Sequence, residues 1–179
     1  IIEDIHKDGL DLLDKNPNYK YDLITDTSME NLIKKLPNYD ACTLRVSKLD
    51  SNILKHCKNL KAISRHGVGY DNVDLKFIKE KNIALLITAK ANAVAVAEHV
   101  FSMMLSISKS IKSYDKEVRE GNFKKNEKNI KTFELLNKNI LIAGFGRIGK
   151  NLISKCLAFD MKVNVYDPYV DKNIIEKLG

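Results

Sequence analysis

Residues 139–167 carry the sequence NILIAGFGRIGKNLISKCLAFDMKVNVYD, which gives the strongest indication of fold in the chain. It predicts an apolar strand, a Gly-x-Gly-x-x-Gly turn, a helix and a second strand, in the order Asn139–Ala143, Gly144–Gly149, Arg147–Phe159 and Lys162–Tyr166. A glycine-rich turn alone is a weak signal. A strand before it, a helix after it and an acidic residue, Asp167, at the end of the next strand together complete the dinucleotide-binding fingerprint.

Each glycine of the fingerprint has a physical reason. Gly144 permits the tight turn, Gly146 lets the backbone approach a pyrophosphate, and Gly149 lets helix and strand pack closely. The backbone amides of Arg147 and Ile148 lie at the predicted helix N-terminus, where free N–H groups and the helix dipole favour phosphate. The sequence therefore predicts a phosphate-binding turn here.

The acidic residue selects between the two nicotinamide cofactors. The Asp167 carboxylate can bind two ribose hydroxyls, and it would repel the 2′-phosphate of NADP. The sequence therefore predicts NAD.

Upstream of the fingerprint, strand and helix patterns alternate. The expected strands are Tyr21–Ile24, Tyr39–Val46, Leu60–Ser64 and Ile83–Thr88, and the expected helices are Ile5–Leu13, Met29–Leu36 and Leu75–Lys81. Such alternation is typical of an α/β fold with a parallel sheet. The first helix has no predicted strand before it and the chain opens without Met, so we expect a cut N-terminus and a missing first strand.

A long helix divides the chain. Asn92 is a good N-cap residue, no Pro or Gly interrupts Ala93–Glu120, and Gly121 fits the position that ends a helix. We therefore predict one helix over residues 93–120 and two domains, 1–91 and 92–179.

Composition excludes several classes of protein. Of the 179 residues, 44% are hydrophobic and 30% are charged, with a formal net charge of +7, so the chain can form a globular core. No stretch reaches the roughly 18–20 apolar residues of a membrane span. Three isolated cysteines fit a reduced cytoplasmic compartment, and no metal-ligand spacing occurs. The positive charge is scattered, which favours a solvated surface, although nucleic-acid binding by the Lys124–Lys131 loop stays an alternative.

Four blocks of the sequence resemble one family. They are Asn59–Asp74, Asn92–His99, Glu134–Leu135, and Gly144–Gly149 with Tyr166–Pro168. In order and spacing they resemble the D-isomer-specific 2-hydroxyacid dehydrogenases, which include D-3-phosphoglycerate, glycerate/hydroxypyruvate and D-lactate dehydrogenases. The resemblance implies a flavodoxin-like substrate domain, residues 1–91, followed by the first half of a Rossmann NAD-binding domain, residues 92–179.

The resemblance also implies substrate-binding residues. The amides of Gly67, Val68 and Gly69 would hold the substrate carboxylate, as open backbone amides bind anions. Arg45 would face the anionic end of the substrate, or lie on the surface, and Asn92 would cap the long helix and belong to the site. Val96 would pack near the nicotinamide, or be a core valine. Phe145 and Pro168 join the predicted cofactor-binding residues.

The resemblance implies an NAD-dependent oxidoreductase that acts on the CH–OH group of a D-2-hydroxy acid. The substrate expected first is of the phosphoglycerate or hydroxypyruvate type. The resemblance also implies a homodimer of the full-length protein, and neither a membrane nor nucleic acid is expected as a partner. The catalytic Arg, acid and His of the family have no matching positions, and we expect structural roles for His66 and His99. We therefore expect a fragment that is inactive alone. The alternatives are a non-catalytic NAD-binding regulatory module and a chain that does not fold.

Overall fold

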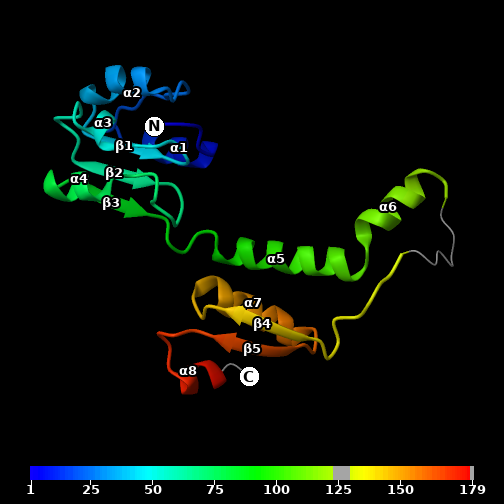
Figure 1. The fold of residues 1–179 in the computed structure, drawn as a ribbon. Coiled ribbons are helices and arrows are strands. Elements are labelled where there is room, and N and C mark those ends of the chain that lie inside the picture. Colours follow the sequence, from blue (N-terminus) through cyan, green and yellow to red (C-terminus); the bar gives the residue numbers. More distant parts are fainter. Residues whose placement is uncertain (123–129, 178–179) are drawn as a thin grey trace. The chain divides into compact units, whose positions relative to one another are not determined.

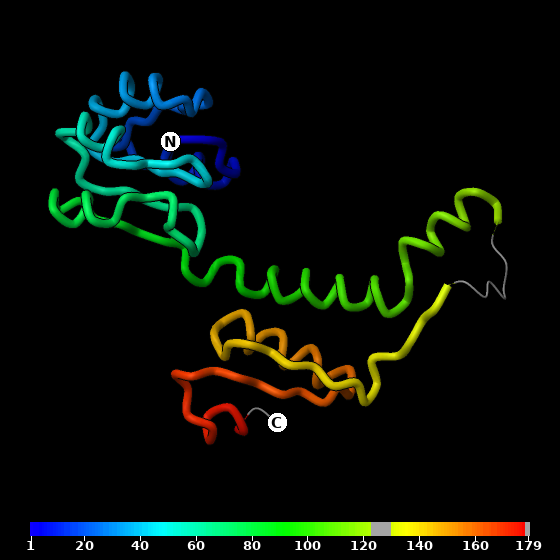
Figure 2. The backbone as a smooth tube through the Cα atoms, in the orientation of Figure 1, coloured from blue at the N-terminus to red at the C-terminus, as the bar shows by residue number. Residues whose placement is uncertain are grey.

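A computed structural model describes residues 1–122 and 130–177 of the chain. The chain divides into two compact units, Ile1–Ala91 and Asn92–Gly179, which Figures 1 and 2 show and which are described separately here. Most of the predicted basic loop, Lys124–Lys131, lies outside the described residues.

The first unit contains a parallel sheet with helices. Its elements are α1 (Lys7–Asp14), α2 (Met29–Lys35), the 3₁₀ helix η1 (Leu36–Asn38), β1 (Ala41–Leu44), α3 (Ser51–Leu54), β2 (Ala62–Arg65), α4 (Leu75–Glu80) and β3 (Ala84–Ile87). The strands are parallel, in the order β1-β2-β3, with Ala62 opposite both Ala41 and Ala84. Side chains cap several helices, because Ser28, Asp50 and Asp74 each accept a hydrogen bond from a first-turn N–H group. The expected α/β class is confirmed.

The sheet extends beyond β1 through the first residues of the chain. The Ile2 N–H donates to the Thr43 carbonyl oxygen at 2.9 Å, and Ile2 pairs with Ile24 in a parallel bridge. The spatial order is therefore Ile24, Ile2, β1, β2, β3, which is the flavodoxin-like 2-1-3-4-5 order. No strand is assigned before α1, and in its position the residues Ile1–Glu3 make only the single bridge of Ile2 to Ile24 and one hydrogen bond to β1. A segment this short shows no periodicity in the sequence.

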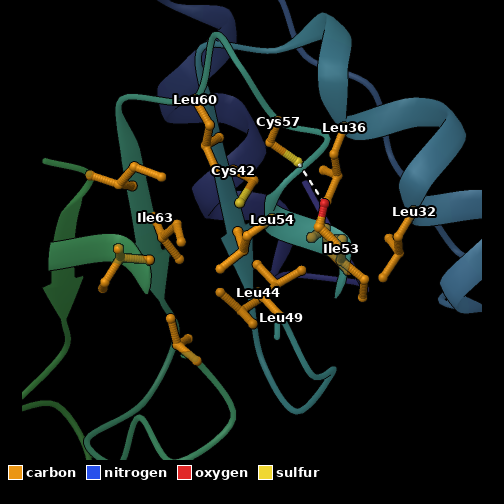
Figure 3. Packing of buried hydrophobic residues seen from close by; sticks show 14 of the residues in the cluster. Leu32, Leu36, Cys42, Leu44, Leu49, Ile53, Leu54, Cys57, Leu60 and Ile63 are labelled. Carbon is orange, nitrogen blue, oxygen red and sulfur yellow. Dashed lines mark hydrogen bonds between the residues drawn. The ribbon is translucent and has the colours of Figure 1, made fainter. Parts of the chain in front are cut away.

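Leucine, isoleucine and cysteine side chains from α2, η1, α3 and the strands form the core of the first unit (Figure 3). Leu44 and Ile63, on neighbouring central strands, are fully buried. Burying such a side chain contributes about 1.5–3 kcal/mol. Burial also raises the pKa of the Cys42 thiol to about 12 and that of Cys57 to about 11. Both thiols are therefore protonated at neutral pH and act as small apolar groups.

The second unit begins with two helices and continues with a strand–helix–strand unit. Its elements are α5 (Ala93–Ser108), α6 (Ile111–Arg119), β4 (Asn139–Ala143), α7 (Arg147–Ala158), β5 (Lys162–Tyr166) and α8 (Lys172–Glu176). Strands β4 and β5 are parallel and in register from Asn139–Lys162 to Ala143–Tyr166. Helix α5 packs on α7, and Phe101 meets Phe159 edge to face with ring centroids 4.7 Å apart.

The prediction of a single helix over residues 93–120 is wrong. Helices α5 and α6 are separate and bend by 62° at the break between Ser108 and Ile111. Ser110 has φ +48°, a left-handed conformation that ends the helical hydrogen bonding. Its Oγ donates to the Lys131 carbonyl oxygen at 2.6 Å, and the Phe133 N–H donates to the Ser108 carbonyl oxygen at 2.8 Å. These hydrogen bonds to residues 131 and 133 hold the break in place. Because they come from a later segment, the local sequence pattern does not predict the break.

No single helix in the described part of the chain is long and apolar enough to cross a membrane. The length and hydropathy criteria are met only by α5 and α6 taken together, across their 62° bend. Helix α5 contributes Ala97 and Phe101 to the core of the second unit.

Candidate functional site

The N-terminus of α7 offers several unpaired N–H groups. Gly146 precedes the helix without a capping side chain, and the first helical bond joins the Lys150 N–H to the Gly146 carbonyl oxygen at 3.0 Å. Among the described residues, the N–H groups of Gly146, Arg147, Ile148 and Gly149 have no hydrogen-bond partner. Such a helix end attracts anions, because the free N–H groups and the helix dipole both favour negative charge.

The turn before α7 fits tightly against the helix. Gly144 has φ +111°, which favours glycine, and its N–H donates to the Tyr166 carbonyl oxygen at 2.7 Å, continuing the β4–β5 ladder. A Cβ atom on Gly149 would overlap the Gly144 carbonyl oxygen. Helix and turn thus lie so close that only glycine fits at position 149. The open N–H groups and this close approach fit the pyrophosphate of a dinucleotide.

Asp167 lies at the end of β5 and bonds to the glycine turn. Its Oδ2 accepts the Phe145 N–H at 2.7 Å, and its Oδ1 accepts the Tyr169 N–H at 2.9 Å. The structure therefore brings Asp167 together with the turn that the sequence predicts as the phosphate-binding element. Pro168 follows and is exposed, while the Phe145 side chain is buried in the core.

These two donors govern the ionisation of Asp167. The Phe145 and Tyr169 N–H groups hold the pKa of Asp167 below its ordinary value of 3.8. Because the folded-state pKa is lowered, the stabilisation by this carboxylate is present above the ordinary pKa and is lost as pH falls through the lowered one. An NMR titration of the Asp167 carboxyl, followed also at the Phe145 amide proton, should have its midpoint below 3.8. A midpoint at or above that value would contradict the observed bonding.

In the first unit, the turn after β2 offers two open amides. Among the described residues, the N–H groups of Val68 and Gly69 have no hydrogen-bond partner. The third amide predicted to bind substrate, that of Gly67, differs because it donates to the Arg65 carbonyl oxygen at 2.9 Å. Two of the three predicted amides are therefore available to an anion.

Two arginines flank this turn. Arg45 follows β1 and is exposed, and its Nη1 lies 3.4 Å from the Asp4 carbonyl oxygen. Arg65, opposite Leu44 in the sheet, folds back so that its Nη1 donates to the His66 carbonyl oxygen at 2.9 Å. The Arg65 guanidinium is thus hydrogen-bonded to the turn that follows β2.

The expected cap by Asn92 is not present. Asn92 precedes α5, but its side chain makes no capping hydrogen bond, and its backbone has φ −109° and ψ 2°, unlike the extended backbone of a capping residue. Val96 is half-buried and lies outside the buried cluster of the second unit. His66 and His99 are exposed. Within the described residues, no group of three His, Cys, Asp or Glu side chains could hold a metal ion.

Two residues that the sequence analysis did not single out bond to the turn after β1. The Glu3 carboxylate accepts hydrogen bonds from that turn, and the Asn72 side chain donates to it. Asn72 belongs to a block that resembles the family, but side-chain contacts between distant segments leave no pattern of spacing in one sequence.

The parallel α/β folds, the glycine turn and the acid after β5 define a dinucleotide-binding protein. Residues 1–137 match the catalytic domain of the D-isomer specific 2-hydroxyacid dehydrogenases, and residues 101–179 match the NAD binding domain of the same family. The chain belongs to this family, which confirms the resemblance seen in the sequence, and its second unit carries the family's NAD-binding sequence.

Three named proteins are similar to this chain. The chain is 33% identical over its whole length to a D-3-phosphoglycerate dehydrogenase of Archaeoglobus fulgidus and covers 34% of that protein. It is 39% identical over 78% of its length to a hydroxypyruvate reductase of Thermotoga maritima and covers 45% of it. A D-lactate dehydrogenase from Aquifex aeolicus, solved with NAD and lactic acid, has a TM-score of 0.83 at 25% identity, over 98% of this chain and 53% of that one. The chain thus spans between a third and about half of these relatives.

Proposed function

We propose that the chain is the substrate- and NAD-binding part of an NAD-dependent dehydrogenase of D-2-hydroxy acids. The observation that carries the proposal is the open N-terminus of α7 beside Asp167, in a chain that belongs to this family. When bound, NAD accepts a hydride from the hydroxyl-bearing carbon of the substrate, which becomes a 2-oxo acid.

The chain's own residues then have separate tasks. The N–H groups of Gly146, Arg147, Ile148 and Gly149 hold the pyrophosphate, and the Asp167 carboxylate accepts the ribose hydroxyls. In the first unit, the Val68 and Gly69 N–H groups hold the substrate carboxylate. The exposed Arg45 guanidinium attracts a second anionic group, such as a phosphate. A phosphoglycerate-type substrate, with a carboxylate and a phosphate, would use both groups, and a hydroxypyruvate-type substrate would use the two amides alone. Relatives of both names match the chain.

Binding and catalysis can be tested separately on the 179-residue chain. Calorimetry should detect NAD binding. No NADH should form on addition of D-glycerate or 3-phosphoglycerate, because none of the positions that resemble the family supplies its Arg, acid and His. A chain that folds but binds no NAD would refute the proposed function, and NADH formation would refute the expected inactivity.

We also infer a homodimer located in the cytoplasm, with neither a membrane nor a nucleic acid as partner. Large apolar side chains on α5 and α6 are exposed, namely Met103, Ile107, Ile111 and Val118, and they support an interface between two copies. Light scattering coupled to size exclusion should give twice the subunit mass for the full-length protein. A monomer at micromolar concentration would contradict this inference.

A further inference from the structure

Three turns of the first unit lie at the carboxyl ends of adjacent strands. Glu3 follows the strand-like residue Ile2, Arg45–Ser47 follow β1, and His66–Asp74 follow β2. The carboxyl ends of neighbouring parallel strands lie at one edge of the sheet, which is where ligands bind in α/β folds. The second and third turns carry Arg45 and the open amides of Val68 and Gly69.

The Glu3 carboxylate bonds to the N–H groups of the Arg45–Ser47 turn. Its Oε2 accepts the N–H groups of Arg45 at 2.7 Å, Val46 at 2.9 Å and Ser47 at 3.3 Å. Glu3 has φ +68°, a left-handed conformation that is unfavourable for a non-glycine residue. Three hydrogen bonds to a charged group can offset that cost.

The ionisation of Glu3 agrees with this geometry. Partial burial opposes ionisation, but the N–H groups of Arg45, Ser47 and Val46 outweigh it and hold the pKa of Glu3 below its ordinary value of 4.5. Glu3 is therefore charged at neutral pH and attracts all three donors.

The Asn72 side chain bonds to the carbonyl oxygens of the same turn. Its Nδ2 donates to the Ser47 carbonyl oxygen at 2.7 Å and to the Arg45 carbonyl oxygen at 3.3 Å. Its backbone carbonyl oxygen accepts the Leu49 N–H at 2.8 Å. Asn72 belongs to the turn after β2, so it ties the turn of Arg45 to the turn of Val68 and Gly69.

We propose that Glu3 and Asn72 are positioning residues, which hold the Arg45–Ser47 turn against the Val68–Gly69 turn so that both face one substrate with two anionic groups. The inference rests on the proposed function, because it assigns the substrate carboxylate to the Val68 and Gly69 amides and a second anionic group to Arg45. Neither Glu3 nor Asn72 needs to touch the substrate, since each acts through the backbone of the turn that it bonds.

The test uses the full 179-residue chain with two variants, Asn72→Ala and Glu3→Gln. Asn59→Ala is the matched control for the first, because the Asn59 Nδ2 also donates to one carbonyl oxygen, that of Pro37 at 3.3 Å, away from the turns. Glu80→Gln is the control for the second, since Glu80 is exposed at the end of α4. Amide NMR spectra, amide hydrogen exchange and titration with 3-phosphoglycerate are measured on each chain.

In the Asn72→Ala chain, the Arg45 and Ser47 carbonyl oxygens lose their donor, so the turn should open more often. Exchange at its Arg45, Val46 and Ser47 amides, which are bonded to Glu3, should accelerate about fivefold to tenfold, as expected for a lost hydrogen bond of about 1 kcal/mol. The Val68 and Gly69 amide resonances should shift, and the Kd for 3-phosphoglycerate should rise by about fivefold or more. The Glu3→Gln substitution should raise the same exchange rates and the Kd by smaller factors, because the amide oxygen still accepts a hydrogen bond. Both controls should match the unsubstituted chain.

The outcomes separate the inference from the proposed function. If 3-phosphoglycerate shifts the Val68 and Gly69 resonances of the unsubstituted chain, but both variants bind it equally well, the positioning inference is wrong and the substrate site stands. If it shifts neither resonance in the unsubstituted chain, the proposed substrate site itself is wrong, and the inference fails with it. If Asn72→Ala does not fold, Glu3→Gln alone decides, since it keeps the acceptor oxygen.

Discussion

Replacing Gly149 with alanine is expected to destabilise the second unit and to abolish measurable NAD binding. A Cβ atom at this position would overlap the Gly144 carbonyl oxygen, which is backbone and cannot rotate away. Turn and helix must separate, and the cost of such overpacking is about 1–3 kcal/mol. The same shift moves the N–H groups at the start of α7. The free energy of NAD binding should therefore decrease by more than the free energy of unfolding. Thermal unfolding and calorimetry with NAD measure the two effects.

Gly146→Ala is the matched comparison. No atom lies within 4 Å of a Cβ placed on Gly146, so this variant should unfold at the temperature of the unsubstituted chain. It should still bind NAD more weakly, since the added methyl group stands where the backbone approaches the pyrophosphate. Equal stability of the two variants would contradict the packing role of Gly149, and unchanged NAD affinity of Gly146→Ala would contradict the position of the pyrophosphate.

Asp167→Ala is expected to weaken NAD binding by about tenfold to a hundredfold, the range for a lost hydrogen bond to a charged group. It should also relax discrimination against NADP, because the carboxylate no longer repels a 2′-phosphate. The Phe145 N–H loses its partner at the same time, so the glycine turn should also shift. Calorimetry with NAD and NADP gives the ratio of affinities, and amide NMR spectra report the turn.

Asp167→Asn separates these two effects. The Asn side chain keeps one oxygen for the Phe145 N–H, carries no charge and loses the bond from the Tyr169 N–H, which lies after the strand and outside the glycine turn. The glycine turn should therefore stay in place while the preference for NAD over NADP decreases. An NAD to NADP ratio that is unchanged in both variants would exclude Asp167 from the ribose site.

Much of the second unit was predictable because its signals are local. The glycine spacing in Gly144–Gly149, the apolar strand before it and Asp167 after the next strand all lie within one short segment. Their steric and hydrogen-bonding requirements act between near neighbours in the chain. The bond between Asp167 and the Phe145 N–H follows from the β4–β5 pairing that this spacing produces.

The errors occur where distant segments decide the backbone. Ser110 interrupts the predicted long helix because the segment that contains Lys131 and Phe133 bonds to it. Ile2 makes its bridge and its hydrogen bond only because Ile24 and β1 lie on either side of it. The Asn92 side chain makes no capping bond, although Asn is a favourable cap residue.

The α/β class, the family and the NAD fingerprint were predictable from residue spacing, because a strand, a turn and a helix each impose local requirements on the residues that form them. Only the tertiary structure showed that the Gly67 amide is already bonded while those of Val68 and Gly69 are open. It alone placed Glu3 and Asn72 on opposite sides of the Arg45–Ser47 turn. The physical reason is that these hydrogen bonds join residues far apart in the chain, which meet only when the parallel strands align.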